Sequence, residues 1–560
     1  MNASRASAGS YRMELPVPFG RFQPNGIGAR ARTSLAIAAA IVFAAAAAAG
    51  QVFDFDSRPT GFLSQQAGGM PADAWNGTTL GTAKRLASGL SPAPRSRALR
   101  DLQFRVLVSE LRPPANDGSA APSLFARRVE RLAAMGEGEN LNEMVRNAGA
   151  YADPPSASIT ANALMMAGDR GAACNIVRNW ELVQPFSRRA AVACQLVAGD
   201  NAAALAAVAP LRGSDPGLAA LVQVAAGGQS AASAPAGPLD GPAMVLLDLA
   251  HVPPPPAALQ STQPPIMRAL VGQRSLPIAT RIDVAERAEA LAIIEATRLG
   301  DLYVEAVKEH ANLPPAMARR AQLVYLARNV TNAQEIMNSV TVVYSEARGN
   351  PMFPTIARAS AFGLLNLPPK PEYANVAQEA VRGFLLLGDK RRTEAWIKLA
   401  ITAALNNSRA LNALDRLMPL AAVAGIDSPK RLPPGEVNRW YEVMRQDDAR
   451  AAPLRGNLLL ELFRATGIYV PARSTDLPEA SPPGARLVMP QAATLSALQS
   501  AAAGRRRAEA ALLASLAIAE TPLVELHPAG VGIIVRSLIQ AGEEEAARLF
   551  AIETAIAHGL

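Results

Sequence analysis

Aromatic residues are scarce in this chain. Phe, Trp and Tyr together make up 5% of its 560 residues, whereas hydrophobic residues as a class make up 50%, with alanine the most frequent. β-Strands are enriched in aromatic and β-branched side chains, because these pack well on a pleated surface. The composition therefore argues against a sheet protein and favours helices. A chain of this length also exceeds one compact core, so a modular body is expected.

Residue types that usually carry chemistry are also few. The four histidines, His251, His310, His527 and His558, are far apart in the sequence and show no H-E-x-x-H spacing for zinc. No lysine-containing phosphate loop and no G-x-S-x-G nucleophile motif occurs. We therefore nominate no catalytic, cofactor-binding or metal-binding residue, and we expect a protein that is not an enzyme and takes no cofactor.

A strong excess of one charge is missing as well. The formal net charge is +8, but residues 1–49 hold five arginines against one glutamate, and without them 50 basic groups face 46 acidic groups, or +4. This balance argues against nucleic acid as a partner. Two basic clusters, Lys390-Arg391-Arg392 and Arg505-Arg506-Arg507, each follow a glycine. They are typical of solvated turns, with an anionic partner such as a phospholipid head group as the alternative.

Long apolar runs are absent after residue 50, but one precedes it. Arg21, Arg30 and Arg32 lead into an apolar stretch, residues 33–49, that ends in three alanines before Gly50. This order is typical of an export signal with a signal-peptidase site, whether translation starts at Met1 or at Met13. The alternative is a retained inner-membrane anchor, although the stretch is shorter than the ~20 residues of a usual span. No cysteine follows the stretch, which argues against a lipoprotein. The predicted location is the periplasm.

A short turn signal recurs along the rest of the chain: an apolar residue, then glycine, then an acidic residue. Glycine can adopt the left-handed backbone conformation that ends a helix, and an acidic residue suits the start of the next helix. Three of the glycines are spaced by 32 and 31 residues, which predicts one helical hairpin per repeat and an all-α, tetratricopeptide-like α-solenoid. The signal occurs at Met135-Gly136-Glu137, Ala167-Gly168-Asp169, Ala198-Gly199-Asp200, Leu299-Gly300-Asp301, Leu387-Gly388-Asp389 and Ala541-Gly542-Glu543.

Composition and periodicity divide the chain into seven parts. The Gly-, Ser- and Pro-rich residues 50–96 predict a flexible tether, and the Pro-, Ala- and Ser-rich residues 228–281 predict a break with one short helix at 242–250. In the last helix, Leu549, Ile552 and Ile556 share one face, which is typical of a cap with one buried side. The parts are 1–49 export signal or anchor, 50–96 tether, 97–227 N-terminal repeats, 228–281 break, 282–470 central repeats, 471–485 linker, and 486–560 C-terminal repeats and cap.

The only two cysteines, Cys174 and Cys194, are centred on residue 184, beside Pro185. If helices 171–183 and 186–198 form an antiparallel hairpin, residues equidistant from the turn lie at the same height. The two sulfurs can then meet in a disulfide, which the oxidising periplasm favours. Two buried thiols are the alternative. No histidine lies near either cysteine in the sequence, which argues against a metal site.

Several short stretches carry a family resemblance: L-M-M-A-G-D-R-G-A-A-C at 164–174, A-V-A-C-Q-L-V-A-G-D at 191–200 and I-Q-A-G-E-E-E-A-A-R-L-F at 539–550. With the alanine-rich export segment, they resemble a group of uncharacterised exported bacterial proteins with tetratricopeptide-like repeats, some labelled antifreeze glycopeptide-related. The resemblance implies a periplasmic helical solenoid and no known activity. A weaker likeness is to the helical superhelix of soluble lytic transglycosylases, but their catalytic Glu-Ser motif has no match here.

These observations favour a non-catalytic periplasmic scaffold or adaptor that binds protein partners of the cell envelope through its repeat surface. Two alternatives stay open: a cell-wall glycan-binding protein, and a cell-wall enzyme whose site is assembled from distant helices. Trp180, Trp396, Trp440 and Tyr441 bear on the first, because exposed aromatic rings would serve as binding platforms whereas buried rings would fill the gaps between repeats.

Overall fold

The computed structural model describes residues 54–228, 237, 239–330, 332–347, 350–405, 408–426, 435–470 and 486–560. The predicted export segment, 1–49, and the predicted linker, 471–485, lie outside the described residues. The described part of the chain from residue 54 onward belongs to one compact unit.

This unit is all-α, as the composition predicts. Its secondary structure is helical apart from three isolated bridge pairs, and no β-sheet occurs in the described ranges. The first helices are α1 (Leu80–Gly89), α2 (Arg97–Val108), α3 (Leu124–Ala134), α4 (Gly138–Asn147), α5 (Pro154–Ala167), α6 (Arg170–Asn179), α7 (Phe186–Val197), α8 (Asn201–Ala207) and α9 (Pro216–Ala225). The next are α10 (Gly241–Leu249), α11 (Pro256–Leu259), α12 (Pro264–Gly272), α13 (Ile278–Ala290), α14 (Ala296–Lys308), α15 (Pro315–Asn329), α16 (Ala333–Ala347), α17 (Phe353–Ala359) and α18 (Ala361–Leu365). The last are α19 (Ala377–Leu386), α20 (Lys390–Ala404), α21 (Ser408–Val423), α22 (Glu436–Asp447), α23 (Ala452–Ala465), α24 (Ala492–Ala503), α25 (Arg507–Ile518), α26 (Pro528–Ala541) and α27 (Glu544–Ala557).

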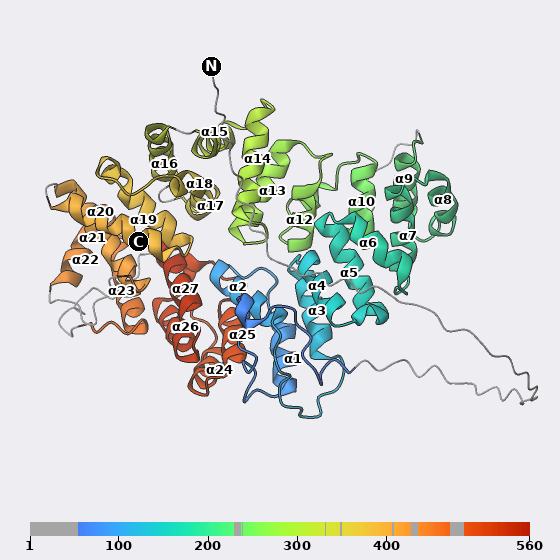
Figure 1. Ribbon diagram of the computed structural model, residues 1–560, viewed down its shortest axis with the longest axis horizontal. Helices are drawn as coiled ribbons and strands as arrows, with labels where there is room; N and C mark the ends of the chain where they lie inside the picture. The colour runs from blue at the N-terminus through green and yellow to red at the C-terminus, as the bar shows by residue number, and fades with distance from the viewer. Residues whose placement is uncertain are drawn as a thin grey trace, which may run out of the picture. The chain divides into compact units, whose positions relative to one another are not determined.

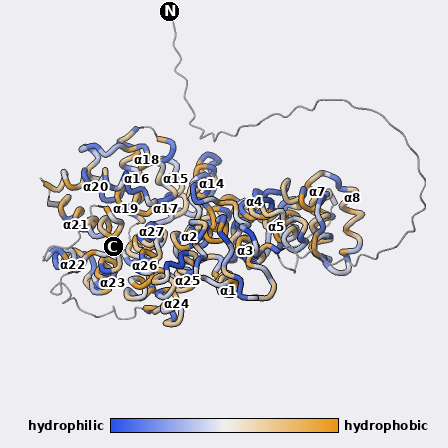
Figure 2. The backbone as a smooth tube through the Cα atoms, turned by 60° about the horizontal axis from the view of Figure 1, so that its bottom comes forward, coloured by the Kyte–Doolittle hydropathy of each residue, from blue (hydrophilic) through white to orange (hydrophobic). Residues whose placement is uncertain are grey.

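Consecutive helices pack as hairpins, which confirms the predicted solenoid-like construction. The pairs α4/α5, α5/α6, α14/α15, α19/α20 and α24/α25 are among those in contact (Figure 1). Hydrophobic and hydrophilic residues alternate along the helices in Figure 2, as expected where one side of each helix is buried.

The glycine turn signals mark helix ends at five of their six positions. Gly136, Gly168 and Gly199 have φ angles of 77°, 90° and 78°, which is the left-handed conformation. After two of these glycines, the acidic side chain begins the next helix: Asp169 accepts a hydrogen bond from the Ala172 amide, and Asp200 from the Ala203 amide, both at 3.0 Å. Gly388 and Gly542 are likewise left-handed.

The prediction of a turn at Leu299-Gly300-Asp301 is wrong, because Gly300 lies inside α14. A Cβ atom at this position would lie 2.2 Å from the guanidinium of Arg328. That guanidinium lies against the helix, where it pairs with Asp301 at 2.7 Å and donates to the Thr297 carbonyl at 3.1 Å. Glycine at position 300 therefore allows Arg328 of α15 to lie close to the backbone of α14. The same three-residue pattern that ends a helix elsewhere lies inside a helix here.

The predicted flexible tether is also wrong for residues 54–96, which form part of the hydrophobic core. Met70 is 1% exposed and Trp75 is 6% exposed. Helix α1 packs against α3 and α25. Most of the large apolar side chains of this Gly- and Pro-rich segment are buried, so a composition typical of a linker gives a packed segment.

The predicted break at 228–281 contains more than one helix. The short helix predicted at 242–250 is α10, but α11 and α12 follow it, and each begins with a proline, Pro256 and Pro264. Proline is tolerated at the first helical position, since the N–H group that it lacks has no partner there in any case. The proline runs therefore mark helix starts, and α12 packs against α5 and α13.

The C-terminal helices were predicted to cap one end of the helical stack. Instead, they pack against the first helices of the chain. Helix α2 contacts α25 and α27, and α1 contacts α25 (Figure 1). Helix α27 also contacts α19, α21, α23 and α26. Its buried face is correspondingly wider than the predicted stripe, and Phe550, Ala551 and Thr554 are fully buried.

Charged side chains are buried where α2, α13, α17 and α27 meet. Glu289 is completely buried; its carboxylate accepts hydrogen bonds from Arg97 Nη1 at 3.0 Å and from Arg358 Nε and Nη2 at 2.6 and 2.9 Å. Burial raises the pKa of the nearby Glu553, although a hydrogen bond from Ser96 Oγ at 2.6 Å and the charge of Arg358 act against the rise. We call Arg97, Glu289, Arg358 and Glu553 the ionic hub. It links residues from the beginning, middle and end of the chain.

Candidate functional site

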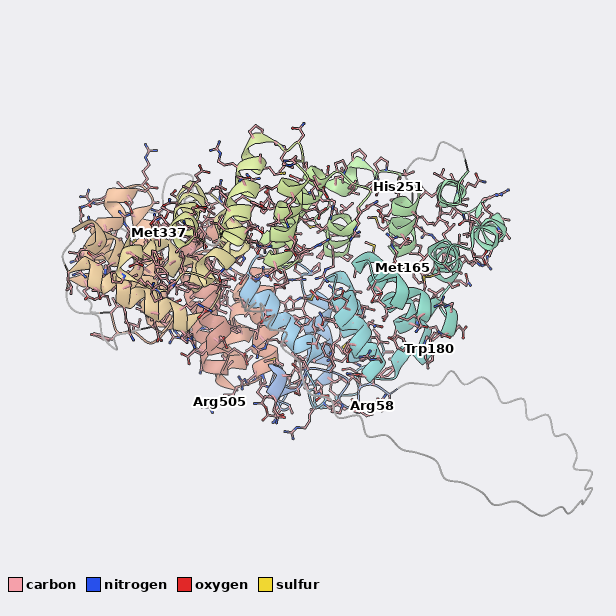
Figure 3. All side chains as sticks on the ribbon, turned by 45° about the horizontal axis from the view of Figure 1, so that its top comes forward. Arg58, Met165, Trp180, His251, Met337 and Arg505 are labelled. Atoms are coloured by element: carbon pink, nitrogen blue, oxygen red, sulfur yellow. A yellow bond between two sulfur atoms is a disulfide. The ribbon has the colours of Figure 1, made fainter. Side chains whose placement is uncertain are left out.

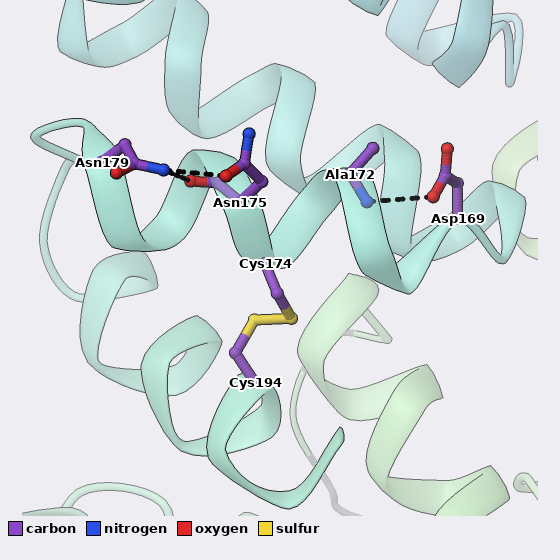
Figure 4. Close-up of a disulfide and its surroundings, with 6 residues drawn as sticks. All are labelled: Asp169, Ala172, Cys174, Asn175, Asn179 and Cys194. Atoms are coloured by element: carbon purple, nitrogen blue, oxygen red, sulfur yellow. Dashed lines mark hydrogen bonds between the residues drawn. A yellow bond between two sulfur atoms is a disulfide. The ribbon is translucent and has the colours of Figure 1, made fainter. Parts of the chain in front are cut away.

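The two cysteines lie on facing helices. Cys174 on α6 and Cys194 on α7 form a disulfide, with Sγ atoms 2.03 Å apart and Cα atoms 5.4 Å apart (Figure 4). Helix α7 ends at Val197, one residue before its predicted end, whereas α6 ends at Asn179, four residues before its predicted end at 183, and the connection between them contains Pro185. The sequence argument from symmetric spacing therefore predicted the correct pairing.

The connection between these helices presents an exposed tryptophan. Trp180 directly follows α6 and is 42% exposed, and Val183 in the same connection is 43% exposed (Figure 3). The indole ring stacks on the ring of Tyr151, with centroids 5.5 Å apart. The Tyr151 hydroxyl in turn contacts Asn142 Oδ1. We call Tyr151, Trp180 and Val183 the aromatic ledge.

Hydrogen bonds to α5 and α6 hold the backbone of the connection between α6 and α7. The Trp180 amide donates to the Ile176 carbonyl at 3.0 Å. The Val183 amide donates to Ser158 Oγ on α5 at 2.8 Å, and that hydroxyl donates to the Pro154 carbonyl at 2.7 Å. These hydrogen bonds fix the ledge to α5 and α6, and the disulfide fixes α6 to α7. The ledge is therefore ordered before a partner binds.

The residues that neighbour the ledge in the sequence are polar and exposed. They are Asn175, Asn179, Glu181 and Gln184, whereas Leu182, between Trp180 and Val183, is buried in the core. An apolar centre with a polar rim is the usual anatomy of a protein-binding surface. Nothing in the sequence distinguished Trp180 from the other tryptophans, because its exposure depends on its position at the end of α6.

The other aromatic residues noted in the sequence do not form a platform. Trp396 is 1% exposed and Trp440 is 4% exposed, with Trp440 against Phe463 at a centroid distance of 5.5 Å. Tyr441 is half-buried against the first of two hydrophobic cores. The first core draws its residues mainly from 55–150 and 336–556, and the second core draws its residues mainly from 157–324. These rings fill gaps between helices, which is the alternative that the sequence left open.

The two basic clusters lie at turns, and several of their arginines are in ion pairs. Arg392 pairs with Asp389, the residue that begins α20. Arg506 pairs with Glu509 at 2.8 Å, and Arg507 with Glu543 at 2.8 Å. Because Glu543 precedes α27, the last of these pairs joins α25 to α27, and the second cluster serves the packing of helices.

The structure does not bring the histidines together. His251 and His310 are exposed at turns, and Nδ1 of His527 accepts a hydrogen bond from the Ala529 amide at the start of α26. His558 is buried, with Nε2 3.1 Å from the Leu523 carbonyl. Within the described ranges, no group of three or more His, Cys, Asp and Glu side chains is arranged to hold a metal ion.

His558 predicts acid sensitivity. Burial lowers the pKa of His558 from 6.5 to about 4, and the nearby Arg455 charge acts in the same direction. Below pH 6.5 the unfolded chain gains a proton here that the folded chain does not, so stability is lost as the pH falls from 6.5 toward 4. At pH 5 we expect His558 to cost about 2 kcal/mol of unfolding free energy relative to pH 7. Urea unfolding at both pH values, with His558→Gln as the comparison, checks this. A variant with the same loss as the parent would refute it.

No helix in the described ranges has the length and apolar character needed to cross a bilayer. Comparison with protein-family models, curated proteins and solved structures returned no match. The functional assignment therefore depends on the geometry described above.

Proposed function

We propose that this protein is a non-catalytic periplasmic scaffold or adaptor that binds protein partners of the cell envelope, and that the aromatic ledge is a principal contact. The observation that carries the proposal is the exposed ring of Trp180, stacked on Tyr151 and attached to a disulfide-linked hairpin. Tryptophan and tyrosine are the residues most enriched among those that dominate binding energy at protein interfaces.

The order of the ledge supports this function further. A binding surface loses affinity when side chains and loops must be immobilised on association. Here the hydrogen bond from the Val183 amide to Ser158 and the cross-link between α6 and α7 supply that order in advance. The exposed Trp180 ring and Val183 suit a partner that presents an apolar side chain from a helix or an extended segment.

A role in glycan binding is the second candidate, because the same exposed indole face also suits a sugar ring. The burial of Trp396 and Trp440 weakens it, since Trp180 is then the one platform among the three tryptophans singled out in the sequence. A cell-wall enzyme has less support, because no pair of catalytic groups emerges from the contacts around the ledge.

Replacing Trp180 by alanine tests the proposal. We expect the variant to lose at least about tenfold in partner recovery, because truncating a central aromatic contact commonly costs more than 1–2 kcal/mol of binding. The measurement is affinity isolation of the tagged full chain from crosslinked cell envelopes, with mass spectrometry of the recovered proteins and of the protein's own N-terminus. The recovered partner is then purified and titrated directly.

The matched control is Met489→Ala, which truncates another exposed apolar side chain, 48% exposed, outside the ledge. It should leave partner recovery unchanged. Equal recovery by both variants would contradict the role of the ledge. Retention of peptidoglycan fragments by the parent but not by Trp180→Ala, with no protein partner, would favour the glycan-binding alternative instead.

A further inference from the structure

A second site lies in the N-terminal region, far along the chain from the ledge. A shallow pocket, open to solvent, lies between the segment after residue 54, the loop before α3, and α3 itself. Its apolar wall includes Phe55 and Phe125, which stack with centroids 4.5 Å apart, and Trp75. The pocket is thus built from the segment predicted to be a tether.

Arg128 is buried in the wall of this pocket without an acidic partner. Its Nε donates to the Leu107 carbonyl at 2.5 Å, Nη1 to Thr60 Oγ1 at 2.9 Å, and Nη2 to the Ser109 carbonyl at 3.2 Å. Burial lowers the pKa of Arg128 to about 10, so the group still carries its charge at neutral pH. Among the described residues its hydrogen-bond partners are all neutral, and a buried charge without a counter-ion is unfavourable.

The one acidic residue in the pocket wall is already paired. Asp56 lies 3.0 Å from Lys84 Nζ, and its Oδ1 accepts a hydrogen bond from the Leu124 amide at 2.8 Å. Lys84 therefore balances the charge of Asp56, and the Asp56 carboxylate also accepts a hydrogen bond from the first residue of α3. It does not neutralise Arg128.

Two more arginines line the same pocket. Arg58 (labelled in Figure 3) donates to the Ala148 carbonyl at 2.8 Å. Its guanidinium lies over the ring of Phe55, 5.9 Å from the centroid. Arg112 is exposed, and its side chain makes no hydrogen bond or ion pair within the described part of the chain. We call Arg58, Arg112 and Arg128 the arginine pocket. It combines three positive charges with an aromatic wall.

We propose that the arginine pocket binds a small molecule or head group that carries an oxyanion, a phosphate or a carboxylate, on an apolar or aromatic body. Guanidinium groups match the geometry of both oxyanions through paired N–H donors. The oxyanion supplies the counter-charge that Arg128 lacks, and the apolar body contacts Phe55, Trp75 and Phe125. The site is independent of the aromatic ledge.

Calorimetric titration of the purified full chain at low salt tests this site. Phenyl phosphate is the main probe, inorganic phosphate tests the oxyanion alone, and benzyl alcohol tests the ring alone. We expect phenyl phosphate to bind at least about tenfold more tightly than inorganic phosphate, and benzyl alcohol not to bind at about 10 mM. Because binding to the folded state stabilises it, phenyl phosphate should also raise the thermal midpoint.

Arg112→Gln is the decisive variant, because the exposed Arg112 side chain makes no hydrogen bond or ion pair in the described ranges and its replacement should leave folding unchanged. It should weaken phenyl phosphate binding at least about tenfold. The control is Arg85→Gln, an exposed arginine on α1 outside the pocket, which should bind like the parent. No binding of phenyl phosphate at about 10 mM, or equal binding by both variants, would overturn the proposal.

Vesicles separate the two sources of such a ligand. If the natural ligand is a lipid head group, the protein should co-sediment with phosphatidylglycerol vesicles more than with phosphatidylcholine vesicles, and Arg112→Gln should remove the difference. If the ligand is a soluble metabolite, phenyl phosphate binding remains while the two vesicle types are bound equally. Both results support the pocket, and neither depends on Trp180.

Discussion

Replacement of Glu289 by alanine is expected to destabilise the protein by about 3–5 kcal/mol. Glu289 is completely buried and receives hydrogen bonds from Arg97 and from Nε and Nη2, the two N–H donors on one edge of the Arg358 guanidinium. Burial acts to lower the pKa of Arg358, but the charge and hydrogen bonds of Glu289, with the charges of Glu553 and Glu295, act against burial and the pKa is raised overall. Without this carboxylate, two guanidinium groups would face each other in a site with little water.

The chain offers a matched control for this prediction. Glu295 also pairs with Arg97, at 3.1 Å, but its side chain is 80% exposed. Glu295→Ala should therefore cost less than about 1 kcal/mol. Urea unfolding, followed by circular dichroism, measures both variants, and Glu289→Gln separates the loss of charge from the loss of volume. Similar losses for Glu289→Ala and Glu295→Ala would show that the ionic hub does not hold the three parts of the chain together.

Removal of the disulfide is expected to cost roughly 3 kcal/mol, from the loss of a cross-link that closes a loop of 20 residues. The double variant Cys174→Ala/Cys194→Ala suits this test, because both side chains are buried among apolar residues of the second core and alanine adds no polar group there. The unfolded chain then gains the conformational freedom that the cross-link denied it.

Hydrogen exchange measured by mass spectrometry locates this effect. Amides of α6 and α7 should lose protection in the double variant, whereas those of α24 and α26 should not, because these helices belong to the other hydrophobic core. Reduction of the parent protein should produce the same change, and the reductant should leave the double variant unaltered. Unchanged protection in α6 and α7 would mean that packing alone orders the hairpin.

Local features of the fold were predictable from the sequence. The helix-ending glycines Gly136, Gly168 and Gly199 carry a physical signal in three residues, and the cysteine pair follows from symmetry about a single turn. Both inferences need only neighbours along the chain. The same limitation explains the error at Gly300, where the glycine makes room for Arg328, a residue on the next helix.

Features that depend on distant partners were not predictable in this way. Glu289 and Arg358 are 69 residues apart, and Ser96 and Glu553 are 457 residues apart, so no periodicity connects them. Trp180 and Trp396 look alike in the sequence, and their exposure differs only because one follows a helix and the other faces the core. The arginine pocket was missed for the same reason: its three arginines come from separate segments.

The contact between the first and the last helices determines when the chain can finish folding. Ser515 on α25 donates to the Leu99 carbonyl on α2, across 416 residues. During synthesis from the N-terminus, α2 can pack against α3 early, but α25 and α27 are made last, so the part of α2 that they cover lacks its native partners during most of synthesis. The first helices therefore reach their native stability only after α25 and α27 have been synthesised and have packed against them.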